Sequence, residues 1–508
     1  MNQGGSLMKN KTPIILVNSL NVDRGGVTKS ALTYANLLAR KCKKVYICTF
    51  LFQKQHKKII ETLYKKGLLD KRVIVLNMFE NLKPNKAYKC IRHKIKEKNF
   101  IEFKTNKENK LSYRYFKEGL YKKYKLFDED GQLELIDYMN DARHRYLREE
   151  YNSLGLLARR RHMDLNVNKP RLDQYFDHKG NCFLSVWVNP KTMKEEKFYH
   201  FTKKHQEYNS LNKLRTKWLN SVIKDIINPV FIIDKRDIDN LMKDVKHSNL
   251  KKIAVLHNNH LKKPYEIGAE IKPSFKFLLN NIDLFNKIVC LTEQQKKDLE
   301  SEVHLGNKGV VLPHAVESDD NQTEKRKDIK YNSLLAITIA RYESQKRLDE
   351  AIRAFKLVVN KIPTAKYDIY GSGSQKESLE RLIMELGLEH NVRLKGYTND
   401  NMNKFSEAAC SILTSDFEGF GRVVTESLYA GTPVVSYDTN YGPSDIVRNN
   451  IDGYIVEKGN KQELANKIIE IFEDKNLYNR LSKRAIEVKE RFNFEKFEEN
   501  WQHLLKNI

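Results

Sequence analysis

Short hydrophobic runs alternate with amphipathic stretches along the first 77 residues. The apolar runs 14–18, 45–50 and 72–76 have the length of buried strands, and the segments 27–40 and 53–66 between them have the period of helices. Buried strands separated by helices are typical of a parallel sheet that is covered on both faces. The same alternation returns after residue 210 and again after residue 330, so the chain predicts two α/β domains.

A different pattern occupies residues 81–209. Apolar and polar positions alternate in short segments such as 121–127 and 182–188, and turn pairs such as Asp130-Gly131 and Lys179-Gly180 separate the segments. Alternation punctuated by hairpin turns predicts an antiparallel sheet. We therefore expect a separate module inserted into the first α/β domain.

The domain organisation follows from these patterns. The length of 508 residues suits two or three domains. We expect an α/β fold with two Rossmann-like domains facing a cleft, the first formed by residues 1–80 and 210–316 and the second by residues 317–490. The insertion spans residues 81–209, and residues 491–508 are expected to form a helix that packs back on the first domain. Ligands prefer the cleft where the C-terminal ends of such strands face one another.

The net positive charge of the chain indicates what kind of molecule it binds. The net charge is +26, and residues 81–220 hold 32 Lys and Arg against 18 Asp and Glu, which is over half of the excess. Such an excess favours a polyanion: nucleic acid, an anionic membrane face or an anionic polymer. A generally lysine-rich proteome is an alternative that needs no partner.

Cysteine usage and hydropathy bear on the compartment. The six cysteines are scattered without a Cys-x-x-Cys pair, which indicates reduced thiols and no disulfide framework. No apolar run approaches the roughly 18 residues needed to cross a bilayer, and the first eleven residues lack the apolar region of a signal peptide. We expect a cytoplasmic protein, with peripheral contact to the inner membrane face as a further option.

The strongest motif runs from Glu418 to Glu426. A predicted strand leads into a glycine-containing turn and then into a helix. Gly419 and Gly421 let backbone N–H groups approach a ligand, and a helix start favours an anion such as a diphosphate. Two carboxylates eight positions apart suit sugar and ribose hydroxyls, which can donate hydrogen bonds to them. The alternative is a capped surface helix that begins with an acid.

Other candidate residues also follow predicted strands. Arg341 offers a planar fork and Lys346 a point charge for phosphate oxygens, so both can neutralise a departing diphosphate. His257 ends a predicted strand and faces the same cleft, and Gly25 and Gly26 follow the first strand of the chain. Each feature also has a structural explanation, because basic residues, histidines and glycines are common at strand ends.

Two further patterns are rejected as sites. Asp128-Glu129-Asp130 matches the Asp-x-Asp sequence that metal-dependent sugar transferases use, but it falls in a hairpin-like turn of the insertion. We therefore expect no metal there. The mixed aromatic and basic residues 113–125 could stack nucleic-acid bases. A strand pair with a solvated basic face explains them more simply, so we expect no nucleic acid.

Together and in this order, the motifs resemble the retaining glycosyltransferases of the GT-B fold. That family is marked by Glu-x7-Glu, here Glu418 and Glu426, and by a phosphate clamp similar to Arg341 and Lys346. The resemblance covers nearly all of both α/β domains. The insertion, His257-Asn258-Asn259-His260 and Tyr441-Gly442-Pro443-Ser444-Asp445 are similar, more narrowly, to the wall teichoic acid α-glycosyltransferases of Gram-positive bacteria.

The resemblance implies a UDP-sugar-dependent retaining hexosyltransferase. It would move glucose or N-acetylglucosamine onto hydroxyls of poly(glycerol-phosphate) or poly(ribitol-phosphate). Arg341 and Lys346 would bind the diphosphate, Glu418 and His257 the donor sugar, and Glu426 the ribose. The further residues implied in binding the UDP-sugar are Gly25, Gly26, Tyr397, Thr398, Gly419, Phe420, Gly421 and Arg422.

The resemblance also implies partners. They are the UDP-sugar, the anionic polymer and further copies of the chain in a homotrimer built through the insertion, with no cofactor and no metal. Two alternatives stay open. An O-glycosyltransferase of Ser/Thr-rich adhesins would act on a mostly neutral polypeptide, and a non-catalytic polyanion-binding protein would leave the Glu418–Glu426 motif unexplained.

Overall fold

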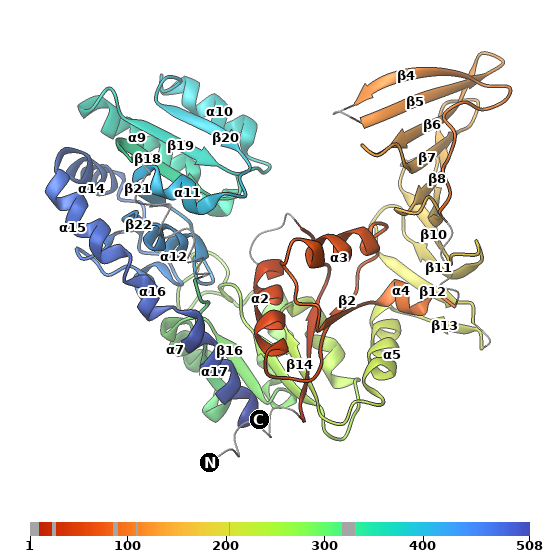
Figure 1. Cartoon of the computed structure of the whole chain (residues 1–508), viewed down its shortest axis with the longest axis horizontal. Helices are drawn as coiled ribbons and strands as arrows, with labels where there is room; N and C mark the ends of the chain where they lie inside the picture. Colours follow the sequence, from red (N-terminus) through yellow and green to blue (C-terminus); the bar gives the residue numbers. More distant parts are fainter. Residues whose placement is uncertain (1–9, 23–26, 85–89, 108–109, 203, 317–330) are drawn as a thin grey trace.

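A computed structural model describes residues 10–22, 27–84, 90–107, 110–202, 204–316 and 331–508 (Figure 1). Two α/β domains lie next to each other, and an antiparallel sheet projects from the N-terminal one (Figure 1). The three sheets have seven, ten and six strands. Among the described residues, no helix has the length and apolar character needed to cross a bilayer.

The N-terminal domain is built on a parallel sheet in the order β17-β16-β15-β14-β1-β2-β3. Its strands read as nearly continuous apolar runs because helices cover both faces. The strands are β1 (Thr12–Val17), β2 (Val45–Thr49), β3 (Val73–Asn77), β14 (Pro229–Ile233), β15 (Lys251–Val255), β16 (Lys287–Cys290) and β17 (Gly309–Val311). The helices are α2 (Val27–Ala39), α3 (His56–Lys65), α4 (Met78–Leu82), α5 (Leu211–Ile223), η1 (Arg236–Lys243), α6 (Pro273–Asn280), η2 (Ile282–Leu284), α7 (Glu293–Glu302) and η3 (Gly306–Lys308).

The inserted sheet is an antiparallel meander in which each strand pairs with the next along the chain. Its strands are β4 (Ile101–Lys107), β5 (Lys110–Lys117), β6 (Leu120–Phe127), β7 (Leu133–Met139), β8 (Arg145–Tyr151), β9 (Leu157–Met163), β10 (Pro170–Phe176), β11 (Cys182–Val188), β12 (Glu195–His200) and β13 (Gln206–Tyr208). The described turns between them include those at Gly131 and Gly180, which take the left-handed backbone that these hairpins need, with φ of 74° and 83°.

The C-terminal domain has a parallel sheet in the order β20-β19-β18-β21-β22-β23. Its strands are β18 (Asn332–Ile339), β19 (Lys366–Tyr370), β20 (Val392–Gly396), β21 (Ala408–Leu413), β22 (Val434–Tyr437) and β23 (Gly453–Val456). Its helices are η5 (Ser344–Lys346), α9 (Leu348–Lys361), α10 (Lys376–Glu385), α11 (Asn401–Ser406), α12 (Arg422–Tyr429), α13 (Pro443–Ile446), α14 (Lys461–Glu473), α15 (Lys475–Ala485), α16 (Val488–Arg491) and α17 (Phe494–Lys506).

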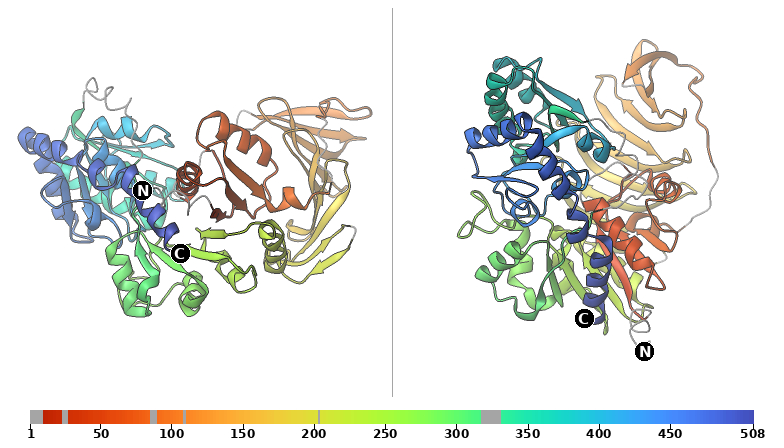
Figure 2. Two further views of the ribbon diagram at one scale, coloured as in Figure 1. Left: turned by 60° about the horizontal axis from the view of Figure 1, so that its bottom comes forward. Right: turned by 60° about the vertical axis from the view of Figure 1, so that its left-hand side comes forward.

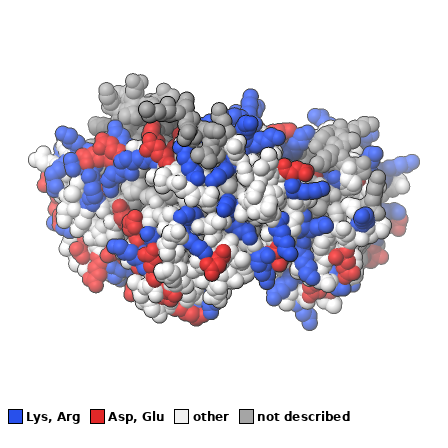
Figure 3. Space-filling model, turned by 90° about the horizontal axis from the view of Figure 1, so that it is seen from below, with Lys and Arg blue, Asp and Glu red and all other residues white. Residues whose placement is uncertain are grey.

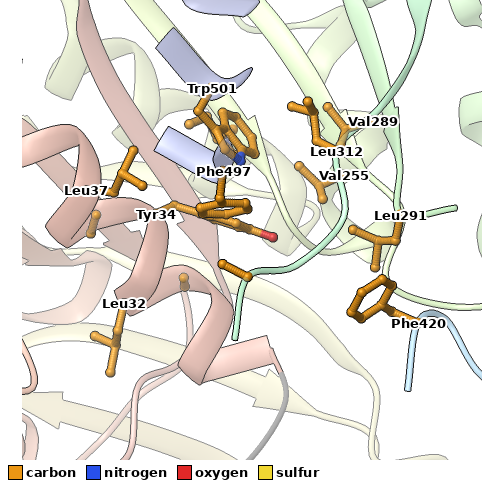
Figure 4. Close-up of a cluster of buried hydrophobic side chains, with 14 of the residues drawn as sticks. Leu32, Tyr34, Leu37, Val255, Val289, Leu291, Leu312, Phe420, Phe497 and Trp501 are labelled. Atoms are coloured by element: carbon orange, nitrogen blue, oxygen red, sulfur yellow. The ribbon is translucent and has the colours of Figure 1, made fainter. Parts of the chain in front are cut away.

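The C-terminal helices join the two domains. Helices α15 and α16 run down from the C-terminal domain, and α17 lies against the N-terminal one (Figures 1 and 2). Trp501 and Phe497 of α17 pack on Tyr34 of α2, with ring centroids 5.0 and 5.9 Å apart. Figure 4 shows this cluster, together with Phe420 of the C-terminal domain beside Leu291. One hydrophobic core therefore includes side chains of both domains.

Positive charge is distributed widely over one face of the molecule (Figure 3). On the face seen from below, Lys and Arg side chains lie among Asp and Glu side chains and form no single uninterrupted field (Figure 3). In the inserted sheet, several arginines pair with acids on neighbouring strands: Arg148 with Asp137, Arg160 with Glu149, and Arg161 with Asp173. Part of the basic excess of this sheet is thus neutralised inside the fold.

Candidate functional site

A buried ion pair lies where β18 and β21 end. The Nζ atom of Lys346 is 2.6 Å from Oε1 of Glu418, and the two side chains keep only 13% and 10% of their exposure. Both residues follow parallel strands of one sheet, so the topology brings them together although 72 residues separate them. The structure thus joins one half of the expected phosphate clamp to the first acid of the Glu-x7-Glu motif.

The loop after Glu418 needs its two glycines for different reasons. Gly421 has φ of 84° and precedes the first residue of α12, so its backbone is one that side chains other than glycine resist. Gly419 touches the other domain. A Cβ atom there would lie 2.0 Å from the carbonyl oxygen of His257. The backbone N–H groups at the start of α12 are therefore held against the N-terminal domain at a position that favours an anion.

His257 follows β15 and is oriented by a carboxylate. Its Nε2 atom is 3.0 Å from Oδ1 of Asp234, whose side chain is fully buried after β14. An ionised Asp234 accepts a hydrogen bond, so Nε2 carries the proton and Nδ1 is left as an acceptor. That tautomer gives the ring a lone pair for a ligand hydroxyl.

A second histidine supports this ring. His314 lies parallel to His257, with ring centroids 5.5 Å apart, and the edge of Phe420 contacts it at the same centroid distance. Burial lowers the pKa of His314 well below its usual 6.5, and the neighbouring His257 and Arg422 lower it further. His314 is therefore neutral and adds no positive charge beside the His257 ring.

Arg341 lies on the turn that carries Lys346, but its side chain is exposed. Its guanidinium is 3.4 Å from Oε1 of Gln345, and Gln345 donates a hydrogen bond to the Phe417 carbonyl. Arg341 is thus linked through Gln345 to the loop that holds Glu418. Its side chain is thus more exposed than that of Lys346, which Glu418 holds.

Glu426 lies one turn into α12. Its Oε2 atom accepts a hydrogen bond of 2.9 Å from Asn401, the first residue of α11. Tyr397 and Thr398 follow β20 and lead into α11. The Tyr397 ring is 61% exposed, and the Thr398 hydroxyl accepts from the Asp400 amide. The two residues expected near the uridine therefore lie on the segment before α11, whose first residue, Asn401, donates to Glu426.

The remaining expected residues fall into two groups. Phe420 is buried against the N-terminal domain, so it serves the contact between domains. Arg422 begins α12, and its charge acts on both Tyr34 and His314 of the other domain. Gly25 and Gly26 lie outside the described residues.

A second set of contacts crosses between the domains beside the site. Lys272 donates to the Asn259 carbonyl at 2.8 Å, and its Nζ atom lies 3.9 Å from the centre of the Phe417 ring. The Tyr265 ring packs on the same ring at a tilt of 42°, with the centroids 4.3 Å apart. Burial lowers the pKa of Lys272 to about 8. The loop between β15 and α6 therefore packs against the loop that carries Glu418.

Sequence reasoning missed Asp234, His314 and Asn401. Asp234 directly follows a strand of the parallel sheet and would have been found by the rule that singled out His257. His314 and Asn401 carry no comparable signal, because only the fold brings them to the site.

The Asp-x-Asp sequence of the insertion has a structural role. The Asp128 carboxylate accepts from the backbone amides of Asp130 and Gln132 and so shapes the hairpin. Asp130 forms an ion pair of 2.9 Å with Lys58 of α3. Within the described part of the chain, no group of three or more His, Cys, Asp or Glu side chains is arranged for a metal ion.

Comparison with known proteins assigns the family. Residues 319–488 match the model "Glycosyl transferases group 1", and residues 14–202 match "Glycosyl transferase 1 domain A". The chain is 30% identical to the poly(glycerol-phosphate) alpha-glucosyltransferase of Bacillus subtilis (strain 168), over 95% of this chain and 73% of the relative. This chain belongs to the group 1 glycosyltransferases.

Two other glycosyltransferases support this assignment. The poly(ribitol-phosphate) alpha-N-acetylglucosaminyltransferase of Staphylococcus aureus (strain COL) is 29% identical over 98% of this chain and all of the relative. The crystal structure of a mutant of S. aureus TarM in complex with fondaparinux, alpha-GlcNAc-glycerol and UDP has a TM-score of 0.83 and 26% identity, covering 97% of this chain and 99% of TarM. The expected GT-B fold and the resemblance to teichoic acid glycosyltransferases are confirmed.

Proposed function

We propose that this glycosyltransferase moves a hexose, with retention of configuration, from a UDP-sugar onto hydroxyls of a teichoic acid polymer. The donor is UDP-glucose or UDP-N-acetylglucosamine, and the acceptor is poly(glycerol-phosphate) or poly(ribitol-phosphate), as in the two relatives. The observation that carries the proposal is the Lys346–Glu418 pair beside the α12 N-terminus, held against His257 of the other domain.

Each group of this site has a role that suits the reaction. The leaving UDP gains negative charge as the glycosidic bond breaks, and Lys346, Arg341 and the α12 N–H groups stabilise that charge. Glu418 accepts hydrogen bonds from sugar hydroxyls. His257, with Nδ1 as acceptor, holds a further hydroxyl from the opposite domain.

Retention needs either two inversions or attack from the face of the leaving group. We propose the front-face route through an oxocarbenium-like state, in which the acceptor hydroxyl loses its proton to the departing diphosphate. Side chains around the site then position and neutralise charge. Since Lys346 already supplies a buried cation next to Glu418, we propose that neither a metal nor another cofactor takes part.

The basic inserted sheet supports an anionic acceptor. Several weak contacts along a phosphate polymer raise its effective concentration at the site, and they weaken as salt screens them. An adhesin acceptor would be mostly neutral, so its transfer would depend little on salt. A non-catalytic polyanion-binding protein would not need the pair of Lys346 and Glu418.

We also propose the assembly and location that accompany this function. The edge strand β4 leaves Ile101 and Phe103 67% and 57% exposed, which suits a homotrimer formed through the inserted sheet. Such an enzyme would act in the cytoplasm, with peripheral contact to the inner membrane face. Sedimentation velocity of the purified protein tests the trimer, and fractionation of cells tests the location.

The deciding experiment is a donor and acceptor screen. Each UDP-hexose is incubated with purified poly(glycerol-phosphate) or poly(ribitol-phosphate), and released UDP is measured along with the sugar attached to polymer. One donor and acceptor pair should give transfer, and the rate should fall with ionic strength. UDP binding without transfer to either polymer would remove the teichoic acid assignment.

A further inference from the structure

Arg215 of α5 is a buried arginine that the protein does not pair. The residue is only 6% exposed. Among the residues that the structure describes, it forms neither a hydrogen bond nor an ion pair, and its Nε atom is enclosed without a partner. Of the guanidinium atoms only Nε is among the enclosed, unpartnered atoms of the described residues, and the remaining 6% exposure of the residue leaves a small opening to solvent. Burying a cation without a partner costs free energy, and a ligand that pairs with it recovers that cost.

Aromatic side chains hold the Arg215 guanidinium in place. The Arg215 guanidinium lies 5.3 Å from the centre of the Phe50 ring, and Trp218 meets the same ring edge-on at 5.5 Å. The acids that act on its charge are Asp237 and Glu195, yet neither forms an ion pair with it. The arginine is therefore held by an aromatic wall, while its hydrogen-bond donors stay available.

The half-buried arginines of the inserted sheet differ in this respect. Five arginines of the inserted sheet each have a carboxylate partner; they are Arg145, Arg148, Arg159, Arg160 and Arg161. Arg159 even lies over a ring, that of Phe52, and still pairs with Glu150 at 2.6 Å. The missing partner at Arg215 is thus not a general property of arginines in this part of the fold.

Arg215 lies at the same edge of the parallel sheet as the candidate site. Phe50 follows β2, Asn18 follows β1, Asp234 follows β14 and His257 follows β15. These four strands are consecutive neighbours in the sheet, so the Phe50 end is about 15 Å from His257. Between Phe50 and His257, Asn18 donates a hydrogen bond of 2.9 Å to the carboxylate of Asp237. This carboxylate is exposed and can also accept hydrogen bonds from hydroxyl groups of a ligand. A line of polar groups therefore leads from the donor site to Arg215.

We infer that Arg215 binds a phosphodiester of the acceptor chain, some repeats away from the hydroxyl that reacts. This inference rests on the proposed function. A polymer with one phosphate per repeat that lies along this edge, with its reacting hydroxyl beside the donor sugar that His257 holds, passes a later phosphate over α5. A guanidinium with open donors binds such a phosphate through charge-assisted hydrogen bonds. Arg215 then selects for a polymeric acceptor without touching the reacting atoms.

The test uses Arg215→Met and Arg215→Lys in the full chain. Because no protein group is left unpaired, Arg215→Met should keep or increase the free energy of unfolding in urea. Its KM for the polymer should rise about 10- to 100-fold, while kcat, KM for the UDP-sugar and KM for an acceptor of one repeat stay unchanged. The KM of Arg215→Lys for the polymer should lie between those of the wild type and Arg215→Met. Arg353→Met, on the exposed side of α9, is the control.

Each other outcome speaks against the inference. An unchanged polymer KM in a folded Arg215→Met variant removes the phosphate contact. An equal rise for the one-repeat acceptor places Arg215 at the reacting centre instead. Unfolding of the variant would mean that the guanidinium stabilises the protein itself. If the wild type fails to glycosylate any polyol-phosphate polymer, the proposed function fails first, which is a separate result.

Discussion

Gly419 and His257 touch through their backbones, although they belong to different domains. A Cβ atom on Gly419 would come within 2.0 Å of the His257 carbonyl oxygen and 2.8 Å of the next amide nitrogen. No flexible side chain can yield there, since both obstacles are backbone. The relative position of Glu418 and His257 therefore depends on a glycine that is needed for space and not for its dihedral angles.

Gly419→Ala should separate the two halves of the site. A displacement of about 1 Å between reacting groups can cost about 100-fold in rate, so we expect a loss of that order in kcat/KM. The control is Gly459→Ala, which has φ of +87° and no atom within 4 Å of the added Cβ. It should lower stability by roughly 1–2 kcal/mol through backbone strain and leave kcat/KM unchanged. Equal activity of Gly419→Ala and wild type would contradict the contact.

Lys346→Ala should remove a charge that stabilises the leaving diphosphate. We expect a fall in kcat/KM of about 100- to 1,000-fold, equivalent to roughly 3–4 kcal/mol of transition-state stabilisation. Lys361→Ala, whose exposed ammonium pairs with Glu473 at 3.0 Å, controls for the loss of a lysine. Steady-state kinetics with the preferred donor decides the matter. Near-normal kcat/KM in Lys346→Ala would exclude this lysine from the clamp.

Asp234→Asn tests the tautomer of His257. An amide cannot enforce a proton on Nε2 as the carboxylate does, and a lost buried partner costs about 1–3 kcal/mol. Transfer should slow by roughly 5- to 150-fold. The double variant with His257→Ala should be no slower than His257→Ala alone, since both changes act on one group. Additive losses would show that Asp234 acts independently of the histidine.

Acid should weaken the contact between the domains through His260. This ring is fully buried and stacks on Tyr441 with an interplanar angle of 4°, and burial followed by the charge of Lys272 lowers the pKa of His260 to about 4. The unfolded chain takes up the proton near pH 6.5, so the contribution to stability is present above that pH and is lost between about pH 6.5 and 4.

The measurement is the free energy of unfolding in urea across this range. The wild type should lose up to roughly 3 kcal/mol relative to His260→Phe on acidification. Phenylalanine keeps a flat ring against Tyr441 and cannot titrate. Parallel pH profiles of the two proteins would mean that His260 does not carry the effect.

Chelation should leave the enzyme active. Since Lys346 supplies positive charge next to Glu418, and Asp128 and Asp130 are engaged in a hairpin and an ion pair, dialysis against EDTA should change the rate by less than about twofold. Readdition of Mg²⁺ or Mn²⁺ is the control. A large loss that either ion restores would require a metal in the reaction.

The parallel strands could be predicted from sequence, whereas half of the inserted sheet could not. Strands of the two α/β domains are buried on both faces, so each reads as an apolar run. β8, β9 and β10 hold arginines and acids at positions that face neighbouring strands, as in Arg148–Asp137 and Arg161–Asp173. Cross-strand ion pairs stabilise such strands without any alternation of hydrophobic residues.

Part of the candidate site could likewise be predicted from the sequence, and part could not. The order of motifs identified Lys346, Glu418 and His257, because each follows a strand whose end faces the other domain. The contact of Gly419 with His257 and the pairing of His257 with Asp234 depend on how the strands and domains are arranged. The spacing of residues along the chain does not predict that arrangement.

Helix α17 has a consequence for biosynthesis. Tyr34 of α2 is covered by Phe497 and Trp501, so the N-terminal domain lacks part of its interior until α17 has left the ribosome. Before α17 is made, a nascent chain would expose the apolar side of α2, and a chaperone that shields such surfaces could bind it while the residues between α2 and α17 are translated.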